Sequence, residues 1–367
     1  MTAAASPIPS NALRRTIRTA SGLVEAGLLA ADKSAAIELL SQDYALAITP
    51  ALADLIDPHD KDDPIGKQFL PDLREHQIAQ EETDDPIGDH AHKKTTGLIH
   101  RYAHKALLKI VGTCPVYCRF CFRREMVGPA KGETLSTRDL EATLAYIAAT
   151  PALHEIIITG GDPLILSVER LHRLAMRLGT IPHLQKIRWH TRYPVALPDH
   201  ITDALAQALT ASGKQTRLAL HINHPKEFSP AVKQAIARLQ KHDIEILSQS
   251  VLLKGINADL AVLEALKTCF YETGMTPYYI HHPDLAKGTA HFRFPLQDGI
   301  ALMHAWHAKN HGLALPRYML DLPGGFGKVD LLSPAVKRLD SQSFEITDRT
   351  GRTHLYQSAD AASSSSF

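Results

Sequence analysis

Three of the chain's four cysteines lie close together, at Cys114, Cys118 and Cys121. Their CxxxCxxC spacing allows one loop to turn three thiolates toward a common centre. A structural zinc site closes with four ligands, whereas iron-sulfur clusters are held by thiolates. Three thiolates without a nearby fourth therefore suit a [4Fe-4S] cluster whose fourth iron binds another molecule. A zinc site or another iron-sulfur centre is the alternative.

A second candidate for chemistry is Lys328, which ends the glycine-rich stretch 321–328. A lysine presented in this way can neutralise a phosphate or bind a carbonyl cofactor through its amine. The stretch is not a P-loop, because GxxxxGK[ST] needs glycine at position 322 and a hydroxyl at 329, where the chain has Leu322 and Val329. A covalent cofactor site and a plain surface loop are both open interpretations.

A third candidate is Gly160-Gly161-Asp162, which follows a short apolar run. Glycines at the end of a strand allow the backbone to approach a ligand closely. The carbonyls or the Asp162 carboxylate would then face a cationic group. The alternative is a tight turn between a strand and a helix.

These residues need a scaffold, and a repeating pattern along the chain predicts one. Short apolar, β-branched runs alternate with amphipathic helical patterns. The runs cover residues 107–111, 155–159, 186–190, 217–221, 245–250 and 277–281, and helices are expected over 137–149, 168–178, 199–211, 259–273 and 297–311 and from Ser229-Pro230 onward. Strands that alternate with helices predict a parallel sheet. Six repeats favour an α/β fold with an open, partial (β/α)6 barrel over a closed eight-stranded barrel.

The candidate residues fall just after the expected strands. The cysteine loop follows the first run, Arg192 follows the third, Gln249 closes the fifth and Asp284 follows the sixth. In barrel-like folds this end of the sheet carries the active site. Their common placement supports the barrel independently of any single motif.

Four segments are expected along the chain. Residues 1–98 form a mostly helical N-terminal extension, with two Asp-Pro-Ile-Gly turns at 63–66 and 85–88. Residues 99–315 form the barrel, residues 316–357 a C-terminal segment with the Lys328 loop, and residues 358–367 a disordered, serine-rich tail.

Composition narrows the class of partner. Basic and acidic residues number 40 and 39, so no overall charge favours nucleic acid or an anionic membrane. The sequence has no apolar run of about 18 residues, the length that a membrane helix requires. A small-molecule partner and a cytoplasmic location are expected. The alternative of a mitochondrial transit peptide rests on Arg14, Arg15 and Arg18 in an acid-free N-terminus.

The cysteine loop, followed by Arg123 and Arg124, resembles that of the radical S-adenosylmethionine (SAM) enzymes. Together with residues 160–164, 249–257, 284–293 and 321–328, it resembles the lysine 2,3-aminomutase family over residues 99–331. The resemblance implies an isomerase that converts L-α-lysine to β-lysine. A 5'-deoxyadenosyl radical would remove a C3 hydrogen, and pyridoxal 5'-phosphate (PLP) would hold the migrating amino group.

The resemblance also implies roles for individual residues. They are Cys114, Cys118 and Cys121 for the cluster; Gly160, Gly161, Asp162 and Gln249 for SAM; Lys328 for covalent PLP, with Arg101, Lys105 and Arg192 for the PLP phosphate; and Arg123, Asp284 and Asp321 for the substrate. Arg123 would grip the substrate carboxylate, which its planar guanidinium suits. Asp284 and Asp321 would hold the far ammonium of lysine.

The two acids make L-lysine the preferred substrate, because they would repel glutamate. An aminomutase for glutamate, ornithine or arginine is an alternative, as is a lysine aminomutase dedicated to elongation factor P. A non-enzymatic metal-cluster protein would leave Lys328 and both acids unexplained. The resemblance further implies an electron donor such as flavodoxin or ferredoxin. No cysteine follows Cys269, so zinc binding and a homo-oligomer are left open.

Overall fold

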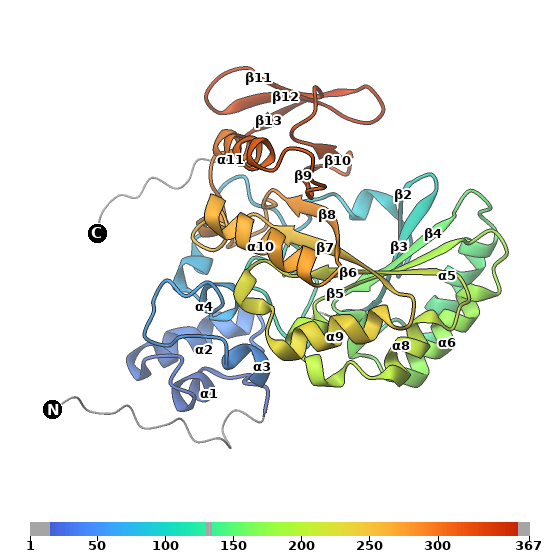
Figure 1. The fold of residues 1–367 in the computed structure, drawn as a ribbon, viewed down its shortest axis with the longest axis horizontal. Helices are drawn as coiled ribbons and strands as arrows, with labels where there is room; N and C mark the ends of the chain where they lie inside the picture. Colours follow the sequence, from blue (N-terminus) through green and yellow to red (C-terminus); the bar gives the residue numbers. More distant parts are fainter. Residues whose placement is uncertain (1–14, 130–131, 133, 359–367) are drawn as a thin grey trace.

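One ten-stranded sheet organises the part of the chain that the computed structural model describes, residues 15–129, 132 and 134–358 (Figure 1). Its strands lie side by side in the order of the sequence. They are β1 (Lys93–Thr95), β2 (Leu98–Tyr102), β3 (Lys105–Val111), β4 (Glu155–Gly160), β5 (Lys186–Thr191), β6 (Gln215–His221), β7 (Glu245–Val251), β8 (Thr276–His281), β9 (Arg317–Leu322) and β10 (Gly327–Asp330).

Strands β3 to β9 run parallel to one another, whereas β1, β2 and β10 pair antiparallel with their neighbours. The six expected runs coincide with β3 to β8, so the α/β fold with an open, partial barrel is confirmed. The parallel order continues through β9, which the sequence did not reveal as a strand. Arg317 and Asp321 interrupt its short apolar run, so the run carried no clear strand signal.

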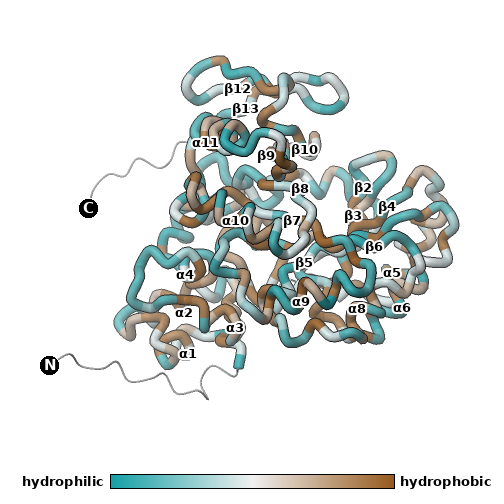
Figure 2. The backbone as a smooth tube through the Cα atoms, in the orientation of Figure 1, coloured by the Kyte–Doolittle hydropathy of each residue, from teal (hydrophilic) through white to brown (hydrophobic). Residues whose placement is uncertain are grey.

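Helices connect the parallel strands and cover the outer face of the sheet (Figure 1). Serine or aspartate side chains accept backbone N–H groups at the starts of four of them, at Ser136, Ser167, Ser229 and Asp259. The connecting helices are α5 (Thr137–Ala148), α6 (Val168–Gly179), α7 (Tyr193–Ala196), α8 (Asp203–Thr210), α9 (Pro230–Gln240), α10 (Leu260–Glu272) and α11 (Leu296–Lys309). Hydrophobic residues gather along the central strands and bury the main core between sheet and helices (Figure 2).

The helix expected over 199–211 begins later than predicted. Pro198–His200 forms a 3-10 turn, and Thr202 then caps α8 by accepting from the backbone N–H of Leu205. The other predicted helices lie within two residues of the observed bounds.

The segment before residue 99 was expected to be mostly helical and consists of short helices separated by turns. Its helices are α1 (Ala20–Glu25), α2 (Ser34–Asp43), α3 (Pro50–Ala53) and α4 (Gly66–Phe69), with 3-10 turns at Ala31–Lys33, Leu73–His76 and His90–His92. Both Asp-Pro-Ile-Gly stretches are loop turns, as predicted. In each, the aspartate carboxylate accepts two backbone N–H groups, from Ile65 and Gly66 to Asp63 and from Asp89 and His90 to Asp85.

The two edges of the open sheet are joined by side chains and turns. The hydroxyl of Tyr102 in β2 accepts from the backbone N–H of Lys328 in β10, at 3.0 Å. Gly88 has φ 68°, and a Cβ atom there would lie 2.2 Å from the backbone nitrogen of Gly325. His92 Nε2 also lies 2.9 Å from the Gly325 carbonyl oxygen. The N-terminal segment therefore holds the glycine-rich lysine loop against β2.

A small antiparallel sheet of β11 (Val336–Arg338), β12 (Ser343–Thr347) and β13 (Thr353–Gln357) lies beyond β10 (Figure 1). Its β12–β13 turn reaches back, and Arg349 Nη2 donates to the Arg101 carbonyl at 3.2 Å. Within the expected tail 358–367, only Ser358 is described, and it is buried. The rest of that tail and Arg14 lie outside the described residues. Within the described ranges, no helix is both long and apolar enough to cross a membrane.

Candidate active site

The cysteine loop follows β3, as predicted, and its thiols are half-buried. Cys114, Cys118 and Cys121 form no disulfide. Burial raises the pKa of all three thiols, to about 11 for Cys121, and neighbouring cysteines of the loop raise it further for Cys114 and Cys121. The three sulfurs are therefore close enough to affect one another. A cationic iron centre would favour their thiolate forms, and the donor set fits an iron-sulfur cluster.

No three His, Cys, Asp or Glu side chains converge around a single metal-ion position in the part of the chain that the structure describes. A four-iron cluster does not require such convergence, because each thiolate binds a different iron.

Buried ion pairs fix the cysteine loop to the N-terminal segment. Glu75 accepts from Arg119 Nε at 2.9 Å and Nη2 at 2.5 Å, and also from Arg124 Nη2. Arg124 Nη1 donates to the Gly288 carbonyl at 3.1 Å. Glu75 is fully buried, so one carboxylate holds the two arginines on either side of Cys121. Sequence reasoning missed Glu75 because its partners lie more than forty positions away.

Arg192 lies beside the cysteine loop and is not brought to Lys328. Its Nη1 donates to Cys118 Sγ at 3.4 Å, and its Nη2 donates to Gln68 at 2.7 Å and Glu227 at 2.5 Å. The guanidinium is buried and held by these partners. This network directs the charge of Arg192 toward the cluster thiols, and its expected contact with the PLP phosphate stays a prediction.

Gly160, Gly161 and Asp162 lie against the start of the cysteine loop. A Cβ atom at Gly160 or Gly161 would lie 2.2 Å from a backbone oxygen, of Val111 or Thr113 respectively. Asp162 Oδ1 accepts from Thr191 Oγ1 at 2.6 Å, and Oδ2 accepts from the Arg192 N–H at 2.8 Å. The Asp162 carboxylate is thus used within the protein, which leaves the glycine backbone to approach a ligand.

Gln249 lies in β7, where its neighbours across the ladder are His221 and Tyr279. Its half-buried side chain makes no hydrogen bond within the described residues. An amide without a partner at the end of a strand is available to a ligand, as the resemblance implies for SAM.

Lys328 and Asp321 face each other across the β9–β10 ladder. Lys328 Nζ donates to Asp321 Oδ2, and His281 Nδ1 lies 3.3 Å from the same oxygen. Burial alone would lower the pKa of Lys328, but the Asp321 carboxylate raises it overall. Burial would likewise raise the pKa of Asp321, but Lys328 and His281 hold it well below its usual range. Asp321 Oδ1 is buried and has no hydrogen-bond partner in the described part of the chain.

Asp284 lies in the same electrostatic environment. Burial and then the Asp321 carboxylate raise the pKa of Asp284 well above its usual value, while Lys328 and Arg123 act in the opposite direction. Its carboxylate makes no hydrogen bond or ion pair to any described residue. The structure therefore brings Asp284, Asp321 and Lys328 together, with free carboxylate oxygens.

Arg101 and Lys105 lie on the β2 and β3 side of Lys328. Arg101 Nη2 donates to Asp89 Oδ1 at 3.1 Å, and its Nη1 lies 4.0 Å from Asp321 Oδ1. Lys105 Nζ lies 4.7 Å from the centre of the Tyr102 ring. Burial lowers the pKa of Lys105, and the charge of Lys328 acts in the same direction. Lys105 makes no hydrogen bond to a carboxylate within the described ranges. These two cations, unlike Arg192, are placed to meet an anionic group near Lys328.

Arg123 is buried and is held along one edge by Asp89, at 3.3 Å from Nε and 3.0 Å from Nη2. Both residues line a cavity of about 550 Å³ that extends to Gly160 and Lys109. Lys328 and the two substrate acids do not line it. Sequence reasoning missed Asp89, although the second Asp-Pro-Ile-Gly turn immediately before it was a usable signal.

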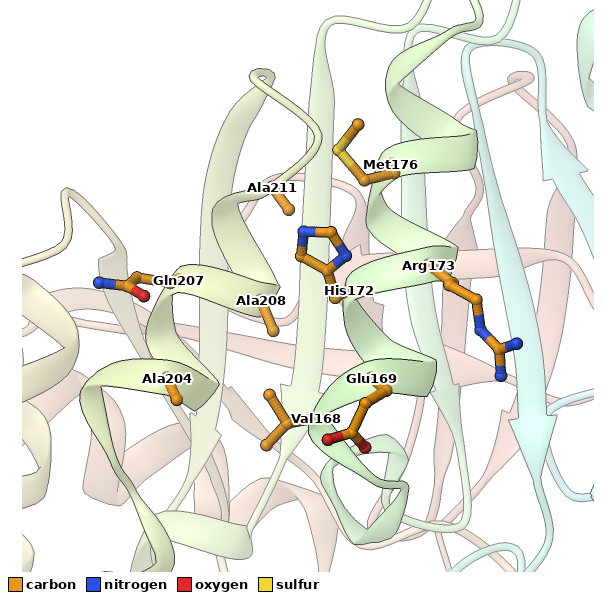
Figure 3. Close-up of a pocket in the computed structure, with 9 residues that line it drawn as sticks. All are labelled: Val168, Glu169, His172, Arg173, Met176, Ala204, Gln207, Ala208 and Ala211. Atoms are coloured by element: carbon orange, nitrogen blue, oxygen red, sulfur yellow. The ribbon is translucent and has the colours of Figure 1, made fainter.

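Another hollow, of about 660 Å³, lies between α6 and α8 on the outer layer of helices (Figure 3). His172 and Met176 of α6 and Ala204 and Ala208 of α8 line it. None of the predicted site residues contributes to this hollow.

The chain is similar to several known proteins. Residues 108–265 match the Radical SAM superfamily. The chain is 32% identical over 320 residues to L-lysine 2,3-aminomutase of Clostridium subterminale, covering 87% of this chain and 76% of that protein. It is 34% identical over 288 residues to L-lysine 2,3-aminomutase of Escherichia coli, covering 78% and 83%. Among solved structures, native anSMEcpe with bound AdoMet aligns with a TM-score of 0.44 at 14% identity, covering 57% of this chain and 62% of that chain.

An open parallel barrel with three free cysteines after its first parallel strand, together with the superfamily match, defines a radical SAM enzyme. Within that superfamily, the chain belongs to the lysine 2,3-aminomutase family and is an isomerase. The expected [4Fe-4S] cluster and SAM are thereby confirmed, and PLP is the further cofactor of the family.

Proposed function

We propose that the chain is a PLP-dependent L-lysine 2,3-aminomutase that converts L-α-lysine to β-lysine. The observation that carries this proposal is the pair of carboxylates beside Lys328. Asp321 Oδ1 is buried without a hydrogen bond to the described chain, and Asp284 has no partner there. A carboxylate without a partner and a second one with an open oxygen favour a substrate with a distal ammonium and disfavour one with a second carboxylate.

When bound, the cluster and SAM supply a carbon radical that removes the C3 hydrogen, and PLP supplies the carbonyl that holds the migrating nitrogen. Cys114, Cys118 and Cys121 would hold the cluster. Gly160, Gly161 and Gln249 would seat SAM. The Gly160 and Gly161 backbone supports this role because it lies directly against the cysteine loop.

Lys328 would bond to PLP, for which its ammonium must lose a proton. Asp321 Oδ2 accepts from Lys328 Nζ and lies 3.3 Å from His281 Nδ1, so this oxygen holds the Lys328 side chain in place. Arg101 and Lys105 would neutralise the phosphate. The fold excludes water at this point, because Asp321 and His281 are both buried.

Arg123 would bind the α-carboxylate of lysine, and Asp284 and Asp321 would bind its distal ammonium. We also propose a cytoplasmic location. A flavodoxin or ferredoxin would serve as the electron donor, because the cluster needs a one-electron donor.

The test is anaerobic incubation of the reconstituted protein with SAM, PLP, a strong reductant and either L-lysine or L-glutamate, followed by identification of the product. We expect β-lysine from lysine and no β-glutamate. Formation of β-glutamate instead would overturn the roles of Asp284 and Asp321. SAM cleavage without either product would point to another amino acid substrate.

A further inference from the structure

We infer that Lys109 and Arg123 form a two-cation site for the α-carboxylate of the amino acid substrate, in which Lys109 is a specificity residue. This inference rests on the proposed function and deepens it. The resemblance assigned only Arg123 to this carboxylate, and nothing in the sequence singled out Lys109.

The first observation is the orientation of Arg123. Asp89 Oδ2 accepts from Nε and Nη2 along one edge of the guanidinium, at 3.3 and 3.0 Å. The remaining nitrogen, Nη1, makes no hydrogen bond within the described residues. Asp89 also accepts from Arg101 and is itself buried, so the guanidinium is fixed before any ligand arrives. Arg123 therefore offers one free donor edge rather than a complete fork.

The second observation is the direction of Lys109. Leu108 and Ile110, its neighbours in β3, are buried in the core between the sheet and the helices. Side chains alternate along a strand, so Lys109 lies on the opposite, concave face. There it lines the same cavity of about 550 Å³ as Arg123. Its ammonium lies 4.0 Å from Met126 Sδ and donates to no carboxylate in the part of the chain that the structure describes.

The third observation is the set of charges around Asp89. Arg101 and Arg123 donate to Asp89, and Lys109 interacts with it electrostatically, so three cations share this buried carboxylate. Of the other acids that line the cavity, Asp139 accepts from Ser136 and Thr96, and Glu125 interacts with Tyr44. Burial and then the Arg123 charge lower the pKa of Lys109. A carboxylate bound between Lys109 and Arg123 would offset the repulsion between these two cations, which a neutral ligand would not do.

The experiment compares L-lysine with cadaverine, which has the same two amines but no carboxylate. The protein carries its cluster and PLP, and no reductant is present, so there is no turnover. Absorbance changes of PLP give the dissociation constant for each ligand. We expect Lys109→Met to lower the preference for lysine over cadaverine about tenfold, the usual effect of one charge-assisted hydrogen bond. Lys109→Arg retains the charge and should preserve most of the preference.

Lys93→Met is the matched control, because Lys93 lines the same cavity but is exposed at its rim. It should leave the preference unchanged. Equal weakening of both ligands by Lys109→Met, or of neither, would overturn the inference. So would weaker SAM binding with an unchanged lysine preference, since the anion would then be the SAM carboxylate. The proposed function is tested separately by β-lysine formation in the unaltered protein, so either idea can fail without the other.

Discussion

The cluster end and the lysine end of the site differ in how their buried carboxylates are satisfied. At the cluster end, both oxygens of Glu75, Glu227 and Asp162 accept hydrogen bonds from the protein. At the lysine end, Asp284 has no partner within the described ranges, and Asp321 Oδ1 accepts no hydrogen bond there. The first arrangement fixes a loop in place, whereas the second keeps acceptors open for a ligand.

This difference separates carboxylates that stabilise the fold from carboxylates that are kept available for a ligand at a cost in stability. Buried, fully bonded ion pairs stabilise one geometry, and loss of one partner is costly. A buried acceptor without a partner is unfavourable by itself and becomes favourable only when a ligand arrives. The cluster end should therefore respond to substitution mainly through folding or metal content, and the lysine end mainly through binding.

The largest expected effect is the loss of the cluster, with the lysine end left unchanged. Cys118→Ala should reduce iron from about four atoms per chain to background, because only two thiolates remain. SAM cleavage should stop, while PLP should still bond to Lys328. Iron analysis and visible absorbance measure these outcomes. Cys269→Ala, outside the loop, is the control, and full iron content in Cys118→Ala would contradict the assignment.

Lys328→Ala should produce the converse result. The PLP imine absorbance and β-lysine formation should both disappear, because no other amine lies at that position. Iron content should remain that of the unaltered protein. Lys337→Ala, an exposed lysine in β11, should retain the absorbance. An imine band that survives in Lys328→Ala would rule out the assignment of this lysine.

Glu75→Gln should mainly affect stability, because it leaves two buried arginines without their counter-charge. We expect the free energy of unfolding to fall by roughly 3 kcal/mol, as when a buried pair loses one partner. Denaturant unfolding of the protein measures this change. Glu141→Gln breaks the exposed pair with Arg177 and should have no measurable effect. Equal stability of the two variants would show that Glu75 does not clamp the loop.

Asp284→Asn should give the smallest effect, confined to lysine binding. Burial and Asp321 raise the pKa of Asp284, so this carboxyl loses its charge at a higher pH than an ordinary aspartate. Since the charged form attracts an ammonium, KM for lysine should increase as the pH falls through that raised pKa. Asparagine should raise KM about tenfold at pH values above that raised pKa and abolish this pH dependence.

The control for Asp284→Asn is Asp298→Asn, an exposed aspartate in α11. It should keep the pH profile of the unaltered protein. A profile of KM against pH that is the same in Asp284→Asn as in the unaltered protein would assign the titration to another group.

Local patterns in the sequence predicted most of the fold. Each of the strands β3 to β8 carries an apolar, β-branched run, and several helices begin directly after a Ser or Asp residue that caps them. Strand β9 was not predicted, because Arg317 and Asp321 shorten its apolar run. The small β11–β13 sheet was not predicted either, since its strands are short and largely polar.

The site could be predicted only where a short stretch of the sequence carries the functional residues. The cysteine loop contains its own signature, the glycine-rich stretch singled out Lys328, and the resemblance supplied the bond of Lys328 to PLP and the two acids. The network of Arg192 could not be predicted because its partners Gln68 and Glu227 are distant in sequence, and side-chain networks of this kind leave no periodic pattern. Asp89 and Glu75 were missed for the same reason.

The junction between Tyr102 and Lys328 has a consequence for the order in which the protein matures. These residues are 226 positions apart, and the whole ladder from β3 to β9 lies between them. During synthesis, the β2 side of the junction leaves the ribosome long before the β10 side. The cysteine loop can meet its N-terminal partners early, whereas the cofactor lysine reaches Tyr102 only after the barrel is assembled. Formation of the bond between Lys328 and PLP would therefore show that a newly made chain has folded as far as β10.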